Sequence, residues 1–292
     1  MMKKFFCHTG IALAAALSLP ADALEFSPGD YEMLPANNSF ALAYFQYAHS
    51  DEFSSQGNKA AGDNRLRSEA TLLRFIHGFR PAENVSIEPQ IIIPFARVNA
   101  LGDASPLGSA SGMGDIITGL PFKFRLDNEG GDILALAPFI YAPTGAYNHE
   151  QAVNVGENRW RYLLQGVWIH HFSDAWAFTT GADVSWTTAN NQYGNNNARL
   201  SQSPRYEYQA YLSYNPTPAT QFGFGGGGIT GASSRVNGVS QHDRLDSTYV
   251  RLSASHFVTP AVQVQFSGGR DIAAEQGFRQ DTNISLRVGY LF

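Results

Sequence analysis

The sequence predicts an all-β fold, a 12-stranded antiparallel transmembrane β-barrel with short periplasmic turns and longer extracellular loops. Only 15% of its 292 residues are charged, against about 25% in typical soluble domains. Short turns alternate with long polar stretches, which is typical of outer-membrane barrels. The segments between them alternate apolar and polar residues over about 11 to 15 positions. That length suffices to cross a bilayer, whereas strands of soluble proteins are most often about 5–6 residues long.

The connections determine the strand count. Short turns are centred near residues 81, 129, 174, 217 and 260. Six longer polar stretches separate them: Ser54–Asn64, Ala100–Ser111, Thr144–Glu157, Ala189–Ser201, Ala232–Asp243 and Ala274–Asp281. Five turns and six loops join twelve strands, and an even number leaves both ends of the barrel chain on the periplasmic side. The expected strands are 39–53, 65–79, 83–97, 113–126, 132–143, 158–172, 175–188, 203–215, 219–231, 245–258, 261–273 and 282–292.

The N-terminal residues predict export. Lys3 and Lys4 precede the apolar run IALAAALSL (11–19), and Ala21-Asp22-Ala23 is a small-x-small cleavage site, so residues 1–23 are expected to be a cleaved signal peptide. A membrane anchor would need about 17–25 apolar residues. The single cysteine, Cys7, lies within the signal peptide, which excludes disulfides and thiolate chemistry from the exported chain. Residues 24–38 are expected either to lie in the periplasm or to enter the barrel as a plug, and residues 39–292 to form the barrel.

The parity of each strand predicts which side chains face lipid. An arginine facing lipid near the bilayer midplane costs about 2–4 kcal/mol, so Arg287 is expected to point into the lumen. The same argument assigns a mixed-charge set to the lumen as the candidate solute path: Glu88, Lys123, Arg125, Asp183, Glu207, Arg251, Gln263, Gln265 and Arg287. The facing of strand 65–79 is ambiguous, because Arg67 and Glu69 share one parity and Arg74 has the other. The facing of strand 158–172 is ambiguous as well.

The last strand, NISLRVGYLF (283–292), has apolar residues at every second position up to the terminal ring. These residues are expected to face lipid and to form the sorting signal that the barrel-assembly machinery binds: Ile284, Leu286, Val288, Tyr290 and Phe292.

Other motifs have structural explanations. Gly223-x-Gly225-x-x-Gly228 matches a dinucleotide fingerprint but continues as a strand with no helix. The adjacent His170 and His171 point to opposite faces of a strand and cannot chelate one metal. His242 and Asp243 lie beside an outer loop, and an enzyme would need them to converge at the rim. We therefore predict no catalytic residues, no cofactor and no metal. The formal net charge of −5 gives no indication of nucleic-acid binding.

Three segments carry a family resemblance: 30–50, 112–124 and YAPTGAYNHEQAVNVGENRW (141–160). In the last, Pro143-Thr144-Gly145 is followed by Asn154, Gly156, Asn158 and Trp160. The chain resembles the outer-membrane transporter family named for the meta-pathway of phenol degradation. The resemblance implies an outer-membrane barrel that passes aromatic or other hydrophobic compounds, and it supplies no catalytic residues.

These features together predict a channel for passive uptake of a small solute across a bacterial outer membrane, in contact with its lipid and lipopolysaccharide. The resemblance favours an aromatic or hydrophobic solute, whereas the polar lumen alone favours a hydrophilic one. The alternative is a structural or adhesive barrel with a closed lumen that uses its loops for contact.

Overall fold

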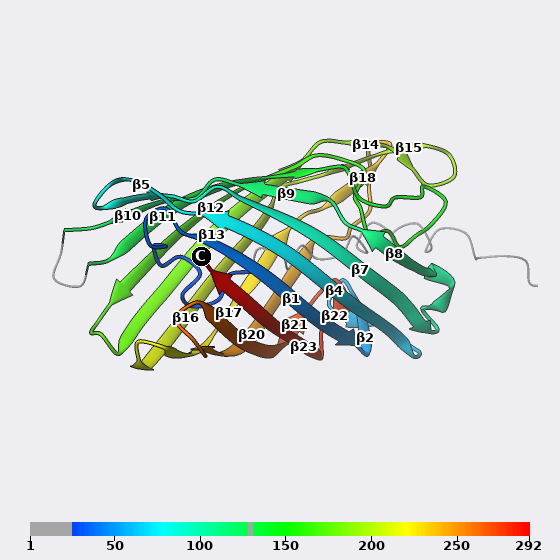
Figure 1. The fold of residues 1–292 in the computed structure, drawn as a ribbon. Coiled ribbons are helices and arrows are strands. Elements are labelled where there is room, and N and C mark those ends of the chain that lie inside the picture. The colour runs from blue at the N-terminus through cyan, green and yellow to red at the C-terminus, as the bar shows by residue number, and fades with distance from the viewer. Residues whose placement is uncertain (1–24, 128–130) are drawn as a thin grey trace, which may run out of the picture.

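The chain forms a closed antiparallel barrel of long, tilted strands (Figure 1). The computed structural model describes residues 25–127 and 131–292, so the expected signal peptide lies outside the described residues. First and last strands pair in register from Phe40↔Leu291 to His49↔Thr282, which closes the wall. The wall has twelve barrel strands, two of which consist of consecutive shorter strands. They are β1 (Ser39–Ser50), β4 (Asn64–His77), β6 with β7 (Val85–Ile87, Gln90–Gly102), β8 with β9 and β10 (Ser109–Met113, Ile116–Gly119, Phe122–Arg125), β11 (Ile133–Ala142), β12 (Arg161–His171), β13 (Trp176–Thr187), β16 (Arg205–Thr217), β17 (Thr220–Gly231), β20 (Leu245–Phe257), β21 (Val262–Ala274) and β23 (Thr282–Leu291).

The predicted 12-stranded barrel is confirmed, but two of its barrel strands are interrupted where continuous strands were expected. The strand predicted over 113–126 is interrupted between β8 and β9 and again between β9 and β10. Pro121 lies at the second break, and Pro94 faces the first, where its carbonyl accepts a bond from the Gly114 N–H. Because proline has no N–H to donate to a ladder, these positions interrupt regular pairing.

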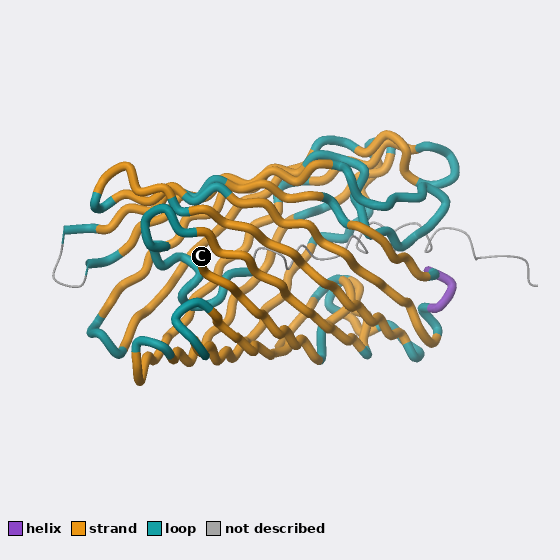
Figure 2. The backbone as a smooth tube through the Cα atoms, in the orientation of Figure 1, coloured by secondary structure: helices purple, strands orange, loops and turns teal. Residues whose placement is uncertain are grey.

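The long connections contain strands of their own, which the alternation of the sequence did not predict. Neighbouring loops pair into a sheet of β14 (Asn190–Tyr193), β15 (Ala198–Gln202), β18 (Ser234–Val236) and β19 (Val239–Ser240). A second sheet joins β22 (Gly277–Arg279), β2 (Glu52–Ser55) and β3 (Asn58–Lys59). The 3-10 helix η2 (Ser105–Leu107) lies in another loop. Figures 1 and 2 show these elements at one end of the barrel, opposite the hairpin of β5 (Phe79–Ala82) and β6.

The outer wall is apolar. On β23 the side chains of Ile284, Leu286, Val288 and Tyr290 are exposed, whereas Arg287 between them is buried. Large aromatic side chains are exposed toward both ends, as in the interfacial belts of membrane barrels: Phe172, Trp176 and Tyr214 at one end, and Trp160, Trp186 and Tyr206 at the other. No helix within residues 25–127 and 131–292 is long and apolar enough to cross a membrane.

The interior has two unlike sides. Along β11 the inward residues Ile133, Ala137 and Phe139 are buried and apolar, and they join a core that extends over β7, β9, β12 and β13. The opposite wall, formed by β1, β20, β21 and β23, presents polar inward side chains such as Gln265 and Arg287. The polar lumen predicted from the sequence is therefore only one side of the interior, because β11 is apolar on both faces.

Candidate functional site

Residues 25–38, named here the lumen segment, lie inside the barrel between its two walls. The segment turns within the lumen, where Asp30 N–H bonds the Ser27 carbonyl at 3.1 Å and Glu32 N–H bonds the Gly29 carbonyl at 3.2 Å. Gly29 has a φ of +87°, which favours glycine at this tight turn. The segment then leads directly into β1 at Ser39.

Ion pairs fasten the lumen segment to the polar wall. The Glu25 carboxylate lies 2.9 Å from Arg251 Nε on β20 and accepts a bond from the Tyr211 hydroxyl at 3.2 Å. Asp30 Oδ1 lies 2.5 Å from Arg287 Nη1 on β23. All four charged side chains of these two pairs are largely buried, so the pairs are screened less by salt than surface pairs.

Lys123 fastens the other end of the turn. Its Nζ lies 2.6 Å from Glu88 Oε2 and donates to the carbonyls of Asp30 and Glu32 at 3.3 and 2.7 Å. Glu88 in turn accepts a bond from the Leu34 N–H at 3.0 Å. One buried ion pair of the wall thus bonds to three backbone groups of the segment. These hydrogen bonds offset the free-energy cost of burying the two charges.

Aromatic packing holds the segment against the apolar wall. The rings of Phe26 and Tyr31 lie 5.8 Å apart in an edge arrangement, and Phe26 packs against Tyr211 at 5.7 Å. The Tyr31 hydroxyl bonds Gln165 on β12. Pro28 packs on Gly223, where an added Cβ would lie only 2.6 Å from the proline ring. The glycine-rich run therefore gives the lumen segment room to approach the wall.

Most residues predicted to line the lumen are inward and buried: Glu88, Lys123, Asp183, Glu207, Arg251, Gln265 and Arg287. Gln263 is half-buried and accepts a bond from Arg287 Nη2 at 2.9 Å. Arg125 is exposed at the last position of β10, beside the short turn. Its parity is inward, as predicted, but β10 ends at this residue. Arg125 therefore lies at the end of the barrel and not beside the lumen segment.

Sequence reasoning missed several lumen residues. Arg74 on β4 points inward, with Leu72 and Ile76, while Arg67 and Glu69 point outward. On β12, Arg161 and Gln165 point inward. The exposed apolar side chains of Leu73 and Phe75 were the available signal for β4, since they alternate with Arg74 near the periplasmic end, where lipid contact begins.

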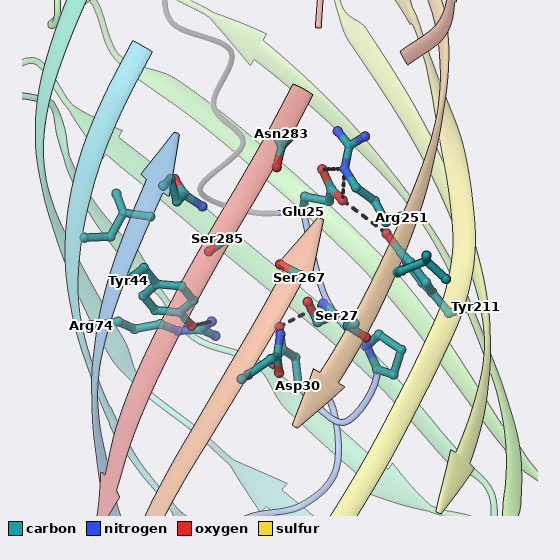
Figure 3. Close-up of a pocket in the computed structure, with 16 residues that line it drawn as sticks. Glu25, Ser27, Asp30, Tyr44, Arg74, Tyr211, Arg251, Ser267, Asn283 and Ser285 are labelled. Atoms are coloured by element: carbon teal, nitrogen blue, oxygen red, sulfur yellow. Dashed lines mark hydrogen bonds and ion pairs between the residues drawn. The ribbon is translucent and has the colours of Figure 1, made fainter. Parts of the chain in front are cut away.

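A narrow cavity remains between the lumen segment and the polar wall (Figure 3). We name it the passage cavity. Its volume is about 50 Å³, and it is lined by Glu25, Ser27, Pro28, Asp30, Tyr44, Gln46, Leu72, Arg74, Tyr211, Arg251, Leu252, Ser253, Gln265, Ser267, Asn283 and Ser285. A cavity that holds benzene measures about 150 Å³, so this space admits water and not an aromatic ring.

Two of the segments that carry the family resemblance, 112–124 and 141–160, meet at the loop end of the barrel. The Asp115 carboxylate accepts bonds from the N–H groups of Gly145 and Glu157, each at 2.9 Å. Gly145 and Gly156 pack so closely that a Cβ on Gly145 would lie 2.7 Å from Gly156 Cα. Asn154 accepts the Asn148 N–H at 2.7 Å. These positions thus have structural roles in folding one loop.

That loop also positions a charged group over the lumen. Glu157 lies 2.8 Å from Arg159 Nε and also pairs with Arg161. Burial alone would raise the pKa of Glu157, but the guanidinium groups of Arg161 and Arg159 outweigh it and hold the pKa at about 2. The network stays charged at neutral pH and braces the mouth of the barrel.

The remaining histidine motifs bond to separate partners. His170 bonds Asp132 at 3.0 Å, while His171 bonds Glu32 of the lumen segment at 2.9 Å. His242 is exposed, whereas Asp243 is buried and accepts the Ser234 N–H at 2.7 Å, so the two do not converge. Within residues 25–127 and 131–292, no group of three or more His, Cys, Asp or Glu gathers to hold a metal ion.

A closed twelve-stranded wall with an apolar outer face, charged inner side and short turns at one end defines an outer-membrane β-barrel. Comparisons with known proteins agree. The family described as "Putative MetA-pathway of phenol degradation" matches residues 50–288. No curated protein sequence matches the chain.

Solved structures extend the comparison. The crystal structure of an outer membrane channel from Pseudomonas putida F1 is 36% identical, with a TM-score of 0.90 over 92% of this chain and 100% of that chain. The β domain of the Bordetella autotransporter BrkA is 10% identical, with a TM-score of 0.59 over 88% of this chain and 100% of that chain. The transport unit of the autotransporter AIDA-I from Escherichia coli is 8% identical, with a TM-score of 0.54 over 96% of each chain. These last two share the fold alone.

The chain therefore belongs to the family described by the phenol-degradation pathway, and it is a protein of the bacterial outer membrane. The predicted family is confirmed, and the match includes segments 112–124 and 141–160, on which the resemblance was partly based.

Proposed function

We propose that the protein is a passive channel through which a small aromatic solute diffuses across the outer membrane, along the polar side of the lumen. The passage cavity carries this proposal, because it lies between the lumen segment and the polar wall. The membership of the family and the 36%-identical outer membrane channel support it further.

Diffusion of a ring through this space requires the lumen segment to move. The cavity of about 50 Å³ is too small for a benzene-sized solute. Apart from its chain connection to β1 at Ser39, the segment is held by ion pairs and hydrogen bonds, so it can move without unfolding the barrel. Residues 25–38 then act as a plug whose displacement admits the solute, while the twelve strands keep their pairing.

Two measurements on the full exported chain test the channel. In planar bilayers we expect stepwise single-channel currents, and their absence would exclude a channel. In liposome swelling we compare benzenesulfonate with cyclohexanesulfonate, which match in charge and differ in aromaticity. We expect benzenesulfonate to enter several-fold faster. Equal rates for these two and for sugars of similar size would contradict an aromatic-selective channel while leaving a general pore.

We also propose where two of the predicted partners bind. We propose that Phe292, with the alternating apolar residues before it on β23, forms the sorting signal for the barrel-assembly machinery. Phe292 stacks on Tyr290 with centroids 5.6 Å apart and lies 6.3 Å from Phe75. We place lipopolysaccharide around the loop end of the wall, where the exposed Trp160 and Trp186 mark the outer interface.

A further inference from the structure

We propose that Arg74 is an anion-binding subsite of the passage cavity and that the solute it recognises is a small aromatic carboxylate. The proposal rests on the proposed function, because it names the substrate class of the same passage. It assigns a specific role to a residue whose strand the sequence left ambiguous.

Arg74 is a largely enclosed guanidinium whose described hydrogen-bond partners are neutral. Its Nε donates to Gln90 Oε1 at 2.6 Å and its Nη1 to the Tyr44 hydroxyl at 3.2 Å. Among the described residues, Nη2 has no hydrogen-bond acceptor and no carboxylate lies within ion-pair distance of the group. A guanidinium carries five N–H donors in a planar fork that matches a carboxylate, so donors remain for a ligand.

The carboxylates nearest to Arg74 around the cavity are already engaged. Asp30 Oδ1 pairs with Arg287, and its Oδ2 accepts the Ser27 N–H at 3.0 Å. Glu25 pairs with Arg251 at 2.9 Å. Both carboxylates that line the cavity are therefore ion-paired with other arginines, and Asp30 interacts with Arg74 only over a longer distance. A buried charge is unfavourable unless it is paired. An anion that enters this space therefore gains binding free energy from pairing with Arg74, and a neutral phenol does not.

The remaining lining suits an aromatic body behind the anionic group. Figure 3 places Tyr44 and Arg74 together on one side of the cavity, with Tyr211 and Arg251 on the other. Ser267 and Ser285 line the wall between them and offer hydroxyl donors. When the lumen segment shifts, the rings of Tyr44 and Tyr211 supply apolar contact for a solute ring, and Arg74 with the serine hydroxyls binds its carboxylate.

Calorimetry on the full exported chain in detergent tests the subsite with benzoate and benzyl alcohol, which differ mainly in charge. We expect the wild type to bind benzoate about tenfold or more tightly than benzyl alcohol, as a charge-assisted pair implies. Arg74→Gln should remove that preference and leave benzyl alcohol unchanged. Arg67→Gln is the matched control, because Arg67 lies on the same strand and points outward. Arg74→Lys keeps the charge without the fork and should fall between.

The outcomes separate the two proposals. The subsite is overturned if the wild type shows no preference for benzoate, or if Arg74→Gln weakens the binding of both ligands equally. The wild-type measurement needs no variant, so it decides even if Arg74→Gln does not fold. In a sodium benzoate gradient across a planar bilayer, the reversal potential should indicate benzoate as the preferred ion and shift toward sodium in Arg74→Gln. Normal currents without that shift refute the subsite alone, whereas absent currents refute the channel.

Discussion

At the scale of single residues, Glu157 makes the loop end of the barrel sensitive to acid. Its folded pKa of about 2 lies below the ordinary 4.5, so its ion pairs stabilise the folded state fully above pH 4.5 and lose that effect as the pH falls through about 2. The difference between the two pKa values corresponds to about 3 kcal/mol. We expect Glu157→Gln to lower the free energy of unfolding by roughly that amount at pH 6, because its two arginine partners lose their counter-charge.

Urea unfolding of the two proteins at a series of pH values measures this. The gap between wild type and Glu157→Gln should shrink below pH 4.5 and close near pH 2, where the protonated acid resembles glutamine. Glu150→Gln, in the same loop and exposed, should match the wild type throughout. A gap that stays constant down to pH 2 would show that the carboxylate charge is not what stabilises the loop.

Single residues also show where the sequence was sufficient. Arg287 was assigned to the lumen because four apolar neighbours of opposite parity required lipid contact. Arg74 could not be assigned, because its strand carries charged residues on both parities and lipid contact covers only part of the strand. Glu157 escaped notice since a loop has no parity, and its partners are fixed by the fold of loop 143–160 and not by a local pattern.

At the scale of elements, the lumen segment is the part whose location sequence reasoning left open. Residues 25–38 have no alternation to decide between periplasm and lumen. Their partners lie far along the chain, as with the Phe26 N–H and Gln209, which bond at 3.2 Å and are 183 positions apart. The strands, in contrast, were readable because pairing, parity and turns are local. The prolines that interrupt these strands are present in the sequence, but the sequence analysis did not predict the interruptions.

We predict that releasing the ion pairs of the lumen segment opens the channel. The double variant Glu25→Gln/Asp30→Asn removes both carboxylates that pair with Arg251 and Arg287, leaving two buried guanidinium groups uncompensated. Single-channel conductance in planar bilayers should rise several-fold as the segment leaves the lumen. The barrel should stay folded, because the twelve strands keep their ladders.

The matched control exchanges two exposed carboxylates, Glu83→Gln with Asp51→Asn, and should conduct like the wild type. Conductance of the double variant equal to that of the control would mean that the aromatic packing of Phe26 and Tyr31 holds the segment without the ion pairs.

At the scale of the whole molecule, the wall places apolar side chains in two different media. Leu252 is 61% exposed near the middle of β20, and Val239 is 67% exposed on β19 in the loop sheet. A soluble protein would treat these two equally exposed positions alike. In an outer-membrane barrel, only Leu252 contacts acyl chains. The sequence indicated this difference through strand length and alternation, since no local feature of either residue distinguishes it.

An arginine at each position therefore measures which medium surrounds it. We expect Leu252→Arg to destabilise the barrel folded in liposomes by about 2–4 kcal/mol, the cost of placing the charge near the midplane. Val239→Arg should change stability by no more than about 0.5 kcal/mol, because a surface substitution in water disturbs little. Reversible urea unfolding from lipid vesicles gives both values. Equal effects at the two sites would mean that β20 does not face lipid, and the assignment of its inward neighbour Arg251 to the solute passage would then fail with it.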